Sequence, residues 1–496
     1  MQGTYRNLLK HSGIYSLGLI LTRLASFLLL PIYTRYLNPA DYGSMAILDL
    51  TAAVLSTLIG TGLVSAVNRY HFEAHNEVEQ DAVWWTGLTF LCLTATALIT
   101  PAWLLRTPLA HLTLGPDYDQ GSYFYTLVLL TLWCGIVGEL PNSYLRIRKW
   151  STLYVGLALS CLLLNIGLNL YFLIILQLGV GGMLLGNLIT GAVKTSVLVG
   201  IFWCSRGPYA LRWPLVRALW HFGGPIAMAT LLALTMHQAD RYLLRVFLDM
   251  DRVGIYSFAY TIGQAINALC LMPFVAIWSV EVYEIAQQPN ARQIYVNIFT
   301  YFVYGLILIM FGISLFSKPL LMLLATPAYV EAADLIPIVC LGYIFFSIHE
   351  HFKVPALLAK RTSSLLPAYL VAALTNIGVN LLAIPLVGIA GAAWTSVLTF
   401  ATFSFVGLWR YRRIDCYPYP LLRCGFVTVG MSLSYLAEQM LTQLYFSGVW
   451  TFMLAAMLWC VWAAVLLGPA VWHFVCSQKG SIVGRLAMVE ARSLDK

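Results

Sequence analysis

Long apolar runs, each about the length that crosses a lipid bilayer, recur along the whole chain and are separated by short polar connections. A helix needs about 20 such residues to span a hydrocarbon core roughly 30 Å thick. The pattern therefore predicts an all-α integral membrane protein with about fourteen transmembrane helices. The predicted spans are 12–37, 41–68, 82–104, 121–143, 153–176, 180–204, 218–247, 252–280, 293–316, 334–350, 363–386, 389–409, 421–444 and 449–474.

A repeated stretch gives these helices an internal order. NIGLNL at 165–170 returns as NIGVNL at 376–381, 211 residues later. A fixed interval kept over a long distance indicates a tandem duplication. Four further pairs share the interval: Lys149 with Lys360, Glu139 with Glu350, Glu73 with Glu284, and Gly43 with Gly254. Six spans is an even number, so the two units are expected to be parallel repeats that form two lobes around a central cavity.

The duplication also predicts the division of the chain. An N-terminal lobe of six helices is expected at 1–204 and a C-terminal lobe of six helices at 218–409, joined by a basic cytoplasmic linker at 205–217. Residues 410–474 hold two extra helices without a counterpart in the first half, and 475–496 form a cytoplasmic tail.

Composition and charge agree with a membrane protein. The 496 residues are 60% hydrophobic and 10% charged, whereas soluble domains carry about 25% charged residues. The clusters of Lys and Arg all fall on one side of the predicted spans, which the positive-inside rule assigns to the cytoplasm together with both termini. The formal net charge of +8 is thus explained by membrane topology, and no nucleic-acid partner is expected.

The sequence lacks the motifs of an enzyme or of a cofactor site. The 10 cysteines occur singly, without Cys-x-x-Cys, so we expect neither a disulfide nor a metal site. There is no glycine-rich phosphate loop, and the predicted loops are too short to hold a catalytic domain. We therefore expect a membrane transporter that needs no cofactor.

Charged residues inside the predicted spans are the first candidates for the transport site. Arg23 would lie roughly 16 Å deep in the first span. Because a central arginine is costly in lipid, it should either face a polar cavity or pair inside the bundle, for instance with Asp49 of the second span. Lys194 of the sixth span either faces the cavity or extends toward the inner surface.

The seventh span adds a polar cluster near its outer end. His237, Asp240 and Arg241 gather on one side of that helix, either as part of the cavity or with Asp240 and Arg241 as a structural ion pair. The repeated Asn165 and Asn169, one turn apart, are expected to form interhelical hydrogen bonds or to contact substrate.

The charge of these candidates leans cationic, which suits an anionic ligand, since guanidinium can hold pyrophosphate oxygens through two parallel hydrogen bonds. Four carboxylates near cytoplasmic helix ends form pairs related by the repeat. They either close the inner side of the cavity as a gate or balance neighbouring basic residues. These residues are Glu73, Glu139, Glu284 and Glu350.

Several stretches resemble a known family. TRLASFLLLPIYTRYLNPADYG near the N-terminus, FGGPIAMA in the seventh span, DRYLL followed by VGIYSFAYTIG, and NIGVNL with VGIAGAAWTSV resemble the polysaccharide transport family. Its members are the O-antigen and oligosaccharide flippases of the multidrug/oligosaccharidyl-lipid/polysaccharide exporter superfamily. The resemblance covers nearly the whole chain.

The resemblance implies a fourteen-helix flippase. Such a protein would move an undecaprenyl-pyrophosphate-linked oligosaccharide from the cytoplasmic to the periplasmic leaflet of a bacterial inner membrane by alternating access. It also implies that Arg23 matches a cavity arginine of related lipid flippases. Similar lipid II flippases carry further arginines on the first two helices, where this chain has Leu29 and Asp49, and this difference argues against lipid II.

The resemblance leaves partners and alternatives to be tested. It implies a coupling ion, either proton or sodium, contact with membrane lipid, and association with a polysaccharide polymerase and chain-length machinery. The alternatives are a multidrug or cation antiporter of the same superfamily and a lipid II flippase. An antiporter cavity should carry buried carboxylates without matching arginines.

Overall fold

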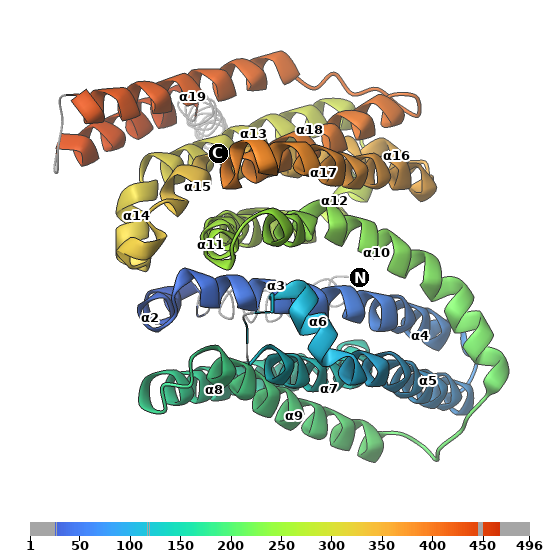
Figure 1. The fold of residues 1–496 in the computed structure, drawn as a ribbon. Helices are drawn as coiled ribbons and strands as arrows, with labels where there is room; N and C mark the ends of the chain where they lie inside the picture. Colours follow the sequence, from blue (N-terminus) through green and yellow to red (C-terminus); the bar gives the residue numbers. More distant parts are fainter. Residues whose placement is uncertain (1–24, 26, 117, 119, 445–449, 467–496) are drawn as a thin grey trace, which may run out of the picture.

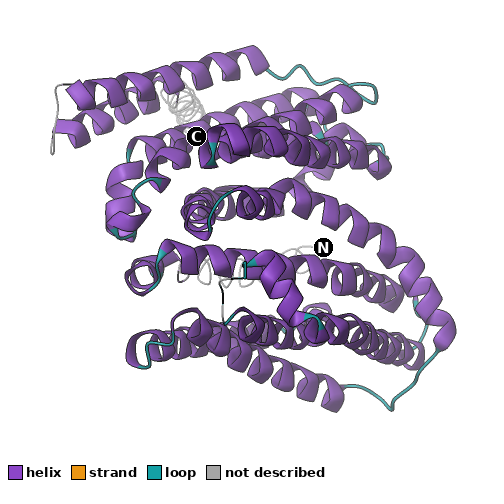
Figure 2. Cartoon of the chain, in the orientation of Figure 1, coloured by secondary structure: helices purple, strands orange, loops and turns teal. Residues whose placement is uncertain are grey.

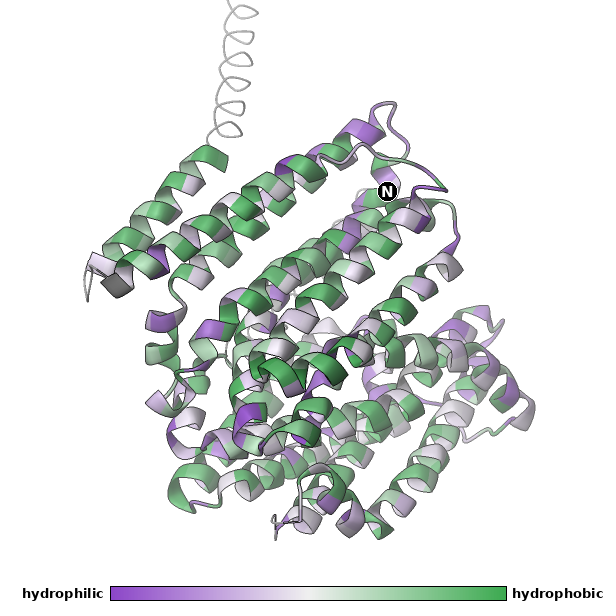
Figure 3. Ribbon diagram, turned by 45° about the horizontal axis from the view of Figure 1, so that its top comes forward, coloured by the Kyte–Doolittle hydropathy of each residue, from purple (hydrophilic) through white to green (hydrophobic). Residues whose placement is uncertain are grey.

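The computed structural model describes residues 25, 27–116, 118, 120–444 and 450–466. Every regular element in this part of the chain is a helix (Figure 2). Hydrophobic residues cover most of the helix lengths, and hydrophilic residues gather at several helix ends and connections (Figure 3). The all-helical membrane architecture expected from the apolar runs is confirmed.

The first group of helices precedes residue 206. Its members are α2 (Leu30–Tyr36), α3 (Pro39–Ser56), the π-helical η1 (Thr57–Thr61), α4 (Gly62–Glu73), α5 (Glu77–Leu104), α6 (Arg106–Thr113), α7 (Gly121–Ile147), α8 (Ser151–Leu170), the π-helical η2 (Tyr171–Ile175) and α9 (Gly179–Ser205).

A single long helix, α10 (Trp213–Phe247), leads to the second group. That group contains α11 (Met250–Ile266), the π-helical η3 (Asn267–Leu271), α12 (Met272–Ile285), α13 (Ala291–Leu315), α14 (Ser317–Leu324), η4 (Pro327–Tyr329), α15 (Ala332–Phe352), α16 (Val354–Leu358), η5 (Thr362–Leu365), α17 (Leu366–Val387), α18 (Ile389–Tyr411) and α19 (Leu421–Leu444).

Ten of the described helices are long and apolar enough to cross a membrane. They correspond to ten of the fourteen predicted spans, and the apolar helix Trp450–Leu466 lies in an eleventh. The predicted span 12–37 falls largely outside the described residues, while 252–280 and 421–444 coincide with helices that are not among the ten. The protein is therefore multi-pass, and the number fourteen stays a prediction.

Local sequence explains where several helices begin. The Asn38 side chain accepts a hydrogen bond from the Asp41 backbone, and the Asp41 side chain accepts one from the Asn38 backbone. This capping box starts α3 directly after Asn38. Helix α10 begins inside the predicted linker 205–217, because WPLVR places a proline in the first turn, where a missing N–H costs nothing.

Several structural features recur at the interval of the sequence repeat. Helix α14 begins and ends 211 residues after α6, and α11 and α15 begin 211 residues after α3 and α7. Lys149 and Lys360 both have a left-handed backbone, with φ of 57° and 56°. Each long helix that starts with α3 or α11 also contains a π-helical segment, η1 or η3.

In Figure 1, α3 and α11 lie between the other helices of the first group, below, and those of the second group, above, and α10 runs along the right edge. Helix α3 packs on α11, and α10 packs on both α4 and α17. Within the groups, α7 packs on α9, and α18 packs on α15 and α17. The contact between the groups is thus formed chiefly by α3, α4, α10 and α11.

Candidate functional site

A polar-edged cavity of about 290 Å³ opens beside α3, between α7 and α9. Its polar lining comes from Asp49 and Ser56 of α3, Thr131 of α7 and Asn187 of α9. Asp49 is an exposed residue of α3. The cavity therefore gives a charged residue of α3 access to space inside the first helix group.

The guanidinium of Arg241 on α10 lies within electrostatic range of Asp49 and of Tyr42, both on α3. Arg241 is 6% exposed and lies over the ring of Tyr260, 4.8 Å from its centroid. The structure thus brings two of the predicted site residues toward one another, Asp49 from α3 and Arg241 from α10.

Asp240 is fully buried behind this arginine. Its carboxylate lies 3.8 Å from the Arg241 guanidinium and accepts a hydrogen bond of 2.9 Å from the Arg241 backbone. The Tyr256 hydroxyl of α11 donates to it, and the Ser396 hydroxyl of α18 donates at 3.3 Å. Asp240 therefore joins α10 to α11 and α18 and holds a counter-charge beside Arg241.

His237 contributes packing to the same region. Its ring lies 4.7 Å from the ring of Phe346 and 5.0 Å from that of Phe400, and its carbonyl accepts from the Arg241 guanidinium at 3.5 Å. The expected proximity of His237, Asp240 and Arg241 is therefore present in the structure, with Asp240 turned into protein.

The other predicted cations lie apart from this cluster. Lys194 is half-buried on α9 near Cys161 of α8, and it makes no ion pair within the described residues. It does not line the cavity that Asp49 borders. Arg23 lies outside the described residues. Whether these two residues share a site with Arg241 stays a prediction.

The repeated asparagines form matching hydrogen bonds. The Asn165 amide donates to Asn187 on α9 at 2.9 Å, and Asn169 donates to Asn165 at 3.0 Å. In the second group, Asn376 donates to the Met236 carbonyl of α10 at 3.3 Å and receives a hydrogen bond from Asn380. These amides tie neighbouring helices together in both groups.

The four predicted gate carboxylates remain near helix ends. Glu73 pairs with Arg69 at 2.7 Å and Glu350 with Lys353 at 2.6 Å, each within its own stretch of chain. Glu139 and Glu284 are exposed and make no ion pair within the described residues. In this conformation no hydrogen bond or ion pair among described residues joins Glu139 to Glu350, or Glu73 to Glu284.

Two glycine crossings bring the helix groups into backbone contact, a feature that single-residue chemistry did not predict. A Cβ added at Gly254 would lie 1.8 Å from the Pro39 carbonyl oxygen and 3.0 Å from the Gly43 nitrogen. A Cβ added at Gly62 would lie 2.0 Å from the Gly223 carbonyl oxygen. Helix α3 therefore crosses α11, and α4 crosses α10, at positions that only glycine allows.

Hydrogen bonds reinforce the contact at the end where α3 and α11 begin. Thr34 donates to the Leu324 carbonyl at 3.0 Å, and Tyr329 donates to the Leu37 carbonyl at 3.1 Å. A little further along, the hydroxyls of Tyr42 and Thr261 are 3.0 Å apart. These hydrogen bonds hold the two helix groups together at this end of the contact.

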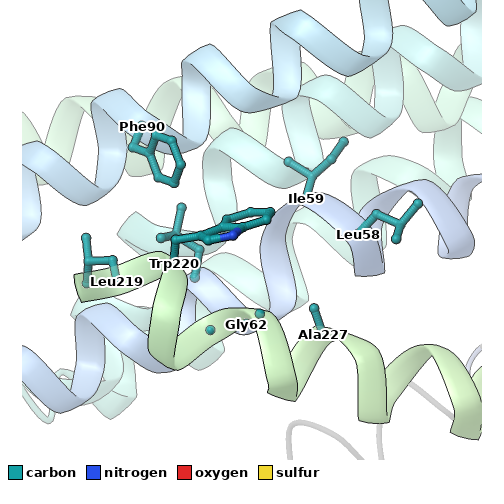
Figure 4. A pocket seen from close by; sticks show the side chains of 10 residues that line it. Leu58, Ile59, Gly62, Phe90, Leu219, Trp220 and Ala227 are labelled. Atoms are coloured by element: carbon teal, nitrogen blue, oxygen red, sulfur yellow. The ribbon is translucent and has the colours of Figure 1, made fainter. Parts of the chain in front are cut away.

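The second glycine crossing, where α4 meets α10 at Gly62 and Gly223, is apolar. A narrow cavity of about 10 Å³ remains beside Gly62 and Gly223, lined by Trp220, Phe90 and aliphatic side chains (Figure 4). The Phe90 and Trp220 rings meet edge to face, 6.3 Å between centroids. Such a volume accommodates no more than a water molecule, so the side chains leave little space at this crossing.

Comparison with known proteins gives a family and a fold. A sequence profile described as "Polysaccharide biosynthesis protein" matches residues 8–278. A search of curated proteins gave no significant match.

Among solved structures, the fold is similar to "Lipid II flippase MurJ, inward closed conformation", with a TM-score of 0.75 and 12% identity over 93% of this chain and 100% of that one. A multidrug resistance MATE family transporter of the MOP superfamily, inward-facing, gives 0.60 and 15% identity over 79% and 94%. The Vibrio cholerae MATE transporter VcmN gives 0.54 and 15% over 82% and 96%. At these identities the likeness concerns the fold.

Proposed function

Because the chain belongs to the polysaccharide biosynthesis protein family, we propose that it is a flippase for an undecaprenyl-pyrophosphate-linked oligosaccharide, an O-antigen or exopolysaccharide repeat unit. It would move this lipid from the cytoplasmic to the periplasmic leaflet of a bacterial inner membrane. The protein is a multi-pass membrane protein with a transporter fold. Both termini are assigned to the cytoplasm from the distribution of Lys and Arg.

We assign the two lobes to 1–204 and 218–409, with 205–217 as their connection, 410–474 as two extra helices and 475–496 as the tail. The recurring helix bounds, the paired left-handed lysines and the paired π-helical segments support a duplicated six-helix unit. With two helices added, this arrangement has fourteen spans.

The observation that carries the substrate class is the position of Arg241. Its guanidinium is buried, yet it lies at the contact between α10 and α3, the place that must open in a two-lobed transporter. One guanidinium group can hold two phosphate oxygens through two parallel hydrogen bonds. Separating the lobes would expose Arg241, still paired with Asp240, to a pyrophosphate on the side that faces Asp49.

The remaining cavity residues are assigned with this arginine. Arg23 and Lys194 would add positive charge for the pyrophosphate, Asp240 would hold Arg241 in place, and His237 would complete the cavity wall. The four glutamates would close the inner side. The coupling ion, proton or sodium, and association with a polymerase and chain-length machinery belong to the same proposal.

A multidrug or cation antiporter is the second candidate, favoured by the carboxylate of Asp49 at a cavity and by the similar folds of two MATE transporters. The positive charge of Arg241, which pairs with Asp240 and acts electrostatically on Asp49, is unfavourable for binding a cation there. A lipid II flippase is disfavoured, because this chain has Asp49 at a position where such a flippase is expected to carry positive charge.

Cells that lack the protein test the substrate class. They are expected to accumulate a lipid-linked oligosaccharide in the inner leaflet and to lose surface polysaccharide, measured by leaflet-selective labelling and mass spectrometry of extracted lipids. Reintroduction of Arg23→Lys should restore part of the export, and Arg23→Ala none. Normal surface glycan with increased sensitivity to cationic drugs would replace the flippase by the antiporter.

The gate has its own test. Replacing Glu139 and Glu350 together by glutamine should speed water access to the cavity from the inner side and reduce export, measured by hydrogen exchange and by surface glycan. Asp334→Asn, at an exposed carboxylate of the second group, is the control. Unchanged exchange and export in the double variant would leave these glutamates as surface charges.

A further inference from the structure

A second cavity, of about 330 Å³, lies where α17 begins and α18 ends. It is lined by Arg361, Arg410 and Arg413, together with two serines and Ile414. None of its lining residues belongs to α3, α4, α10 or α11, because it is built only from the η5 region and the end of α18. The transport mechanism proposed above makes no use of it.

The charge of this cavity is uncompensated. None of Arg361, Arg410 and Arg413 forms an ion pair within the described residues, and the Nε of Arg410 is buried without a hydrogen-bond partner. The Ser363 hydroxyl is exposed and likewise makes no hydrogen bond within the described part of the chain. Three guanidinium groups that share one cavity repel each other unless an anion lies among them.

The surroundings of the cavity indicate which anion is at hand. Helix α18 exposes Trp394, Phe405 and Trp409, and α17 exposes Leu366 and Leu370, so both helices present an apolar face of the kind that meets lipid. Arg413 lies over the Trp409 ring at 4.1 Å. A tryptophan with a stacked arginine at a helix end is typical of the headgroup level of a bilayer.

We propose that the Arg361–Arg410–Arg413 cavity binds the phosphate group of an anionic phospholipid. The guanidinium groups and the Ser363 hydroxyl would donate to the phosphate oxygens, while the acyl chains lie along the exposed residues of α17 and α18. Basic pockets beside transmembrane helices on the cytoplasmic side select such headgroups. The Lys and Arg distribution of the chain places this cavity on that side.

The test uses the purified full-length protein, titrated with phosphatidylglycerol in detergent and followed by native mass spectrometry. Arg361→Ala and Arg413→Ala are each expected to weaken phosphatidylglycerol binding about fivefold, and Arg413→Lys to weaken it less. The matched control is Arg412→Ala, an exposed neighbour outside the cavity lining, which should bind as the unmodified protein does. Phosphatidylcholine should bind weakly to the unmodified protein and to all four variants.

Two outcomes overturn the proposal. Equal phosphatidylglycerol affinity in Arg412→Ala and Arg413→Ala would show that overall surface charge, rather than this cavity, attracts the lipid. The second is that inorganic pyrophosphate binds the unmodified protein and is lost in Arg413→Ala, while phosphatidylglycerol affinity is the same in both. That result would assign the cavity to a water-borne or substrate phosphate.

Discussion

Gly254→Ala is expected to disrupt the close backbone contact between α3 and α11 and to reduce export at least about tenfold. The added Cβ would lie 1.8 Å from the Pro39 carbonyl oxygen, so the two backbones must move apart. Overpacking costs typically ~1–3 kcal/mol, and 1.4 kcal/mol is about a factor of ten in an equilibrium. Spin labels at Tyr36 and Val330, in a background without native cysteines, should report a longer separation.

Gly305→Ala on α13 is the matched control, since a Cβ there would meet nothing within 4 Å. Both variants gain the same helix propensity from alanine, roughly 1 kcal/mol, so this gain cancels in the comparison. If Gly254→Ala kept the short label separation and full export, the α3–α11 crossing would have no part in the closed conformation.

The second large effect is expected from Asp240→Ala. This change leaves the Arg241 guanidinium buried without its carboxylate and removes the acceptor of Tyr256 and Ser396. Breaking a buried ion pair costs about 3–5 kcal/mol, so the thermal unfolding midpoint in detergent should fall sharply. Asp240→Asn, which keeps an acceptor oxygen, should lose less.

Asp334→Ala provides the comparison for this variant. Its ion pair with Lys318 is 3.9 Å long, nearly equal to the 3.8 Å of Asp240 and Arg241, but the Asp334 side chain is 70% exposed. Exposed pairs contribute only ~0–1 kcal/mol. Equal shifts of the unfolding midpoint in Asp240→Ala and Asp334→Ala would mean that burial of Asp240 does not matter for stability.

Much of the helical fold follows from the sequence because apolar length and period are local properties. The short helix α6 lies between the predicted spans 82–104 and 121–143, and its eight residues are too few to signal a span. Its start and end reappear in α14 at the repeat interval. Comparing the two repeats of the sequence at this interval could therefore have revealed both short helices, α6 and α14.

The candidate site was only partly predictable. Asp240 and Arg241 are neighbours in sequence, so their pairing could be expected. The approach of Asp49 to Arg241 depends on how α3 and α10 pack, and the crossing of Gly62 with Gly223 depends on which helix faces meet. Neither the hydrophobic pattern nor the charge of a residue contains that information, because both depend on contacts between distant parts of the chain.

The distance between the two glycine crossings determines how far the two helix groups separate when they rotate against each other. Gly43 and Gly62 lie on one long helical stretch, Pro39–Glu73, 19 residues apart. At 1.5 Å per residue they are separated by roughly 28 Å. If one crossing stays in contact as a pivot, a tilt of about 20° displaces the other by ~10 Å, about the diameter of a helix with its side chains. A small rotation about one glycine crossing is therefore enough to separate the two helix groups by about a helix diameter at the other crossing.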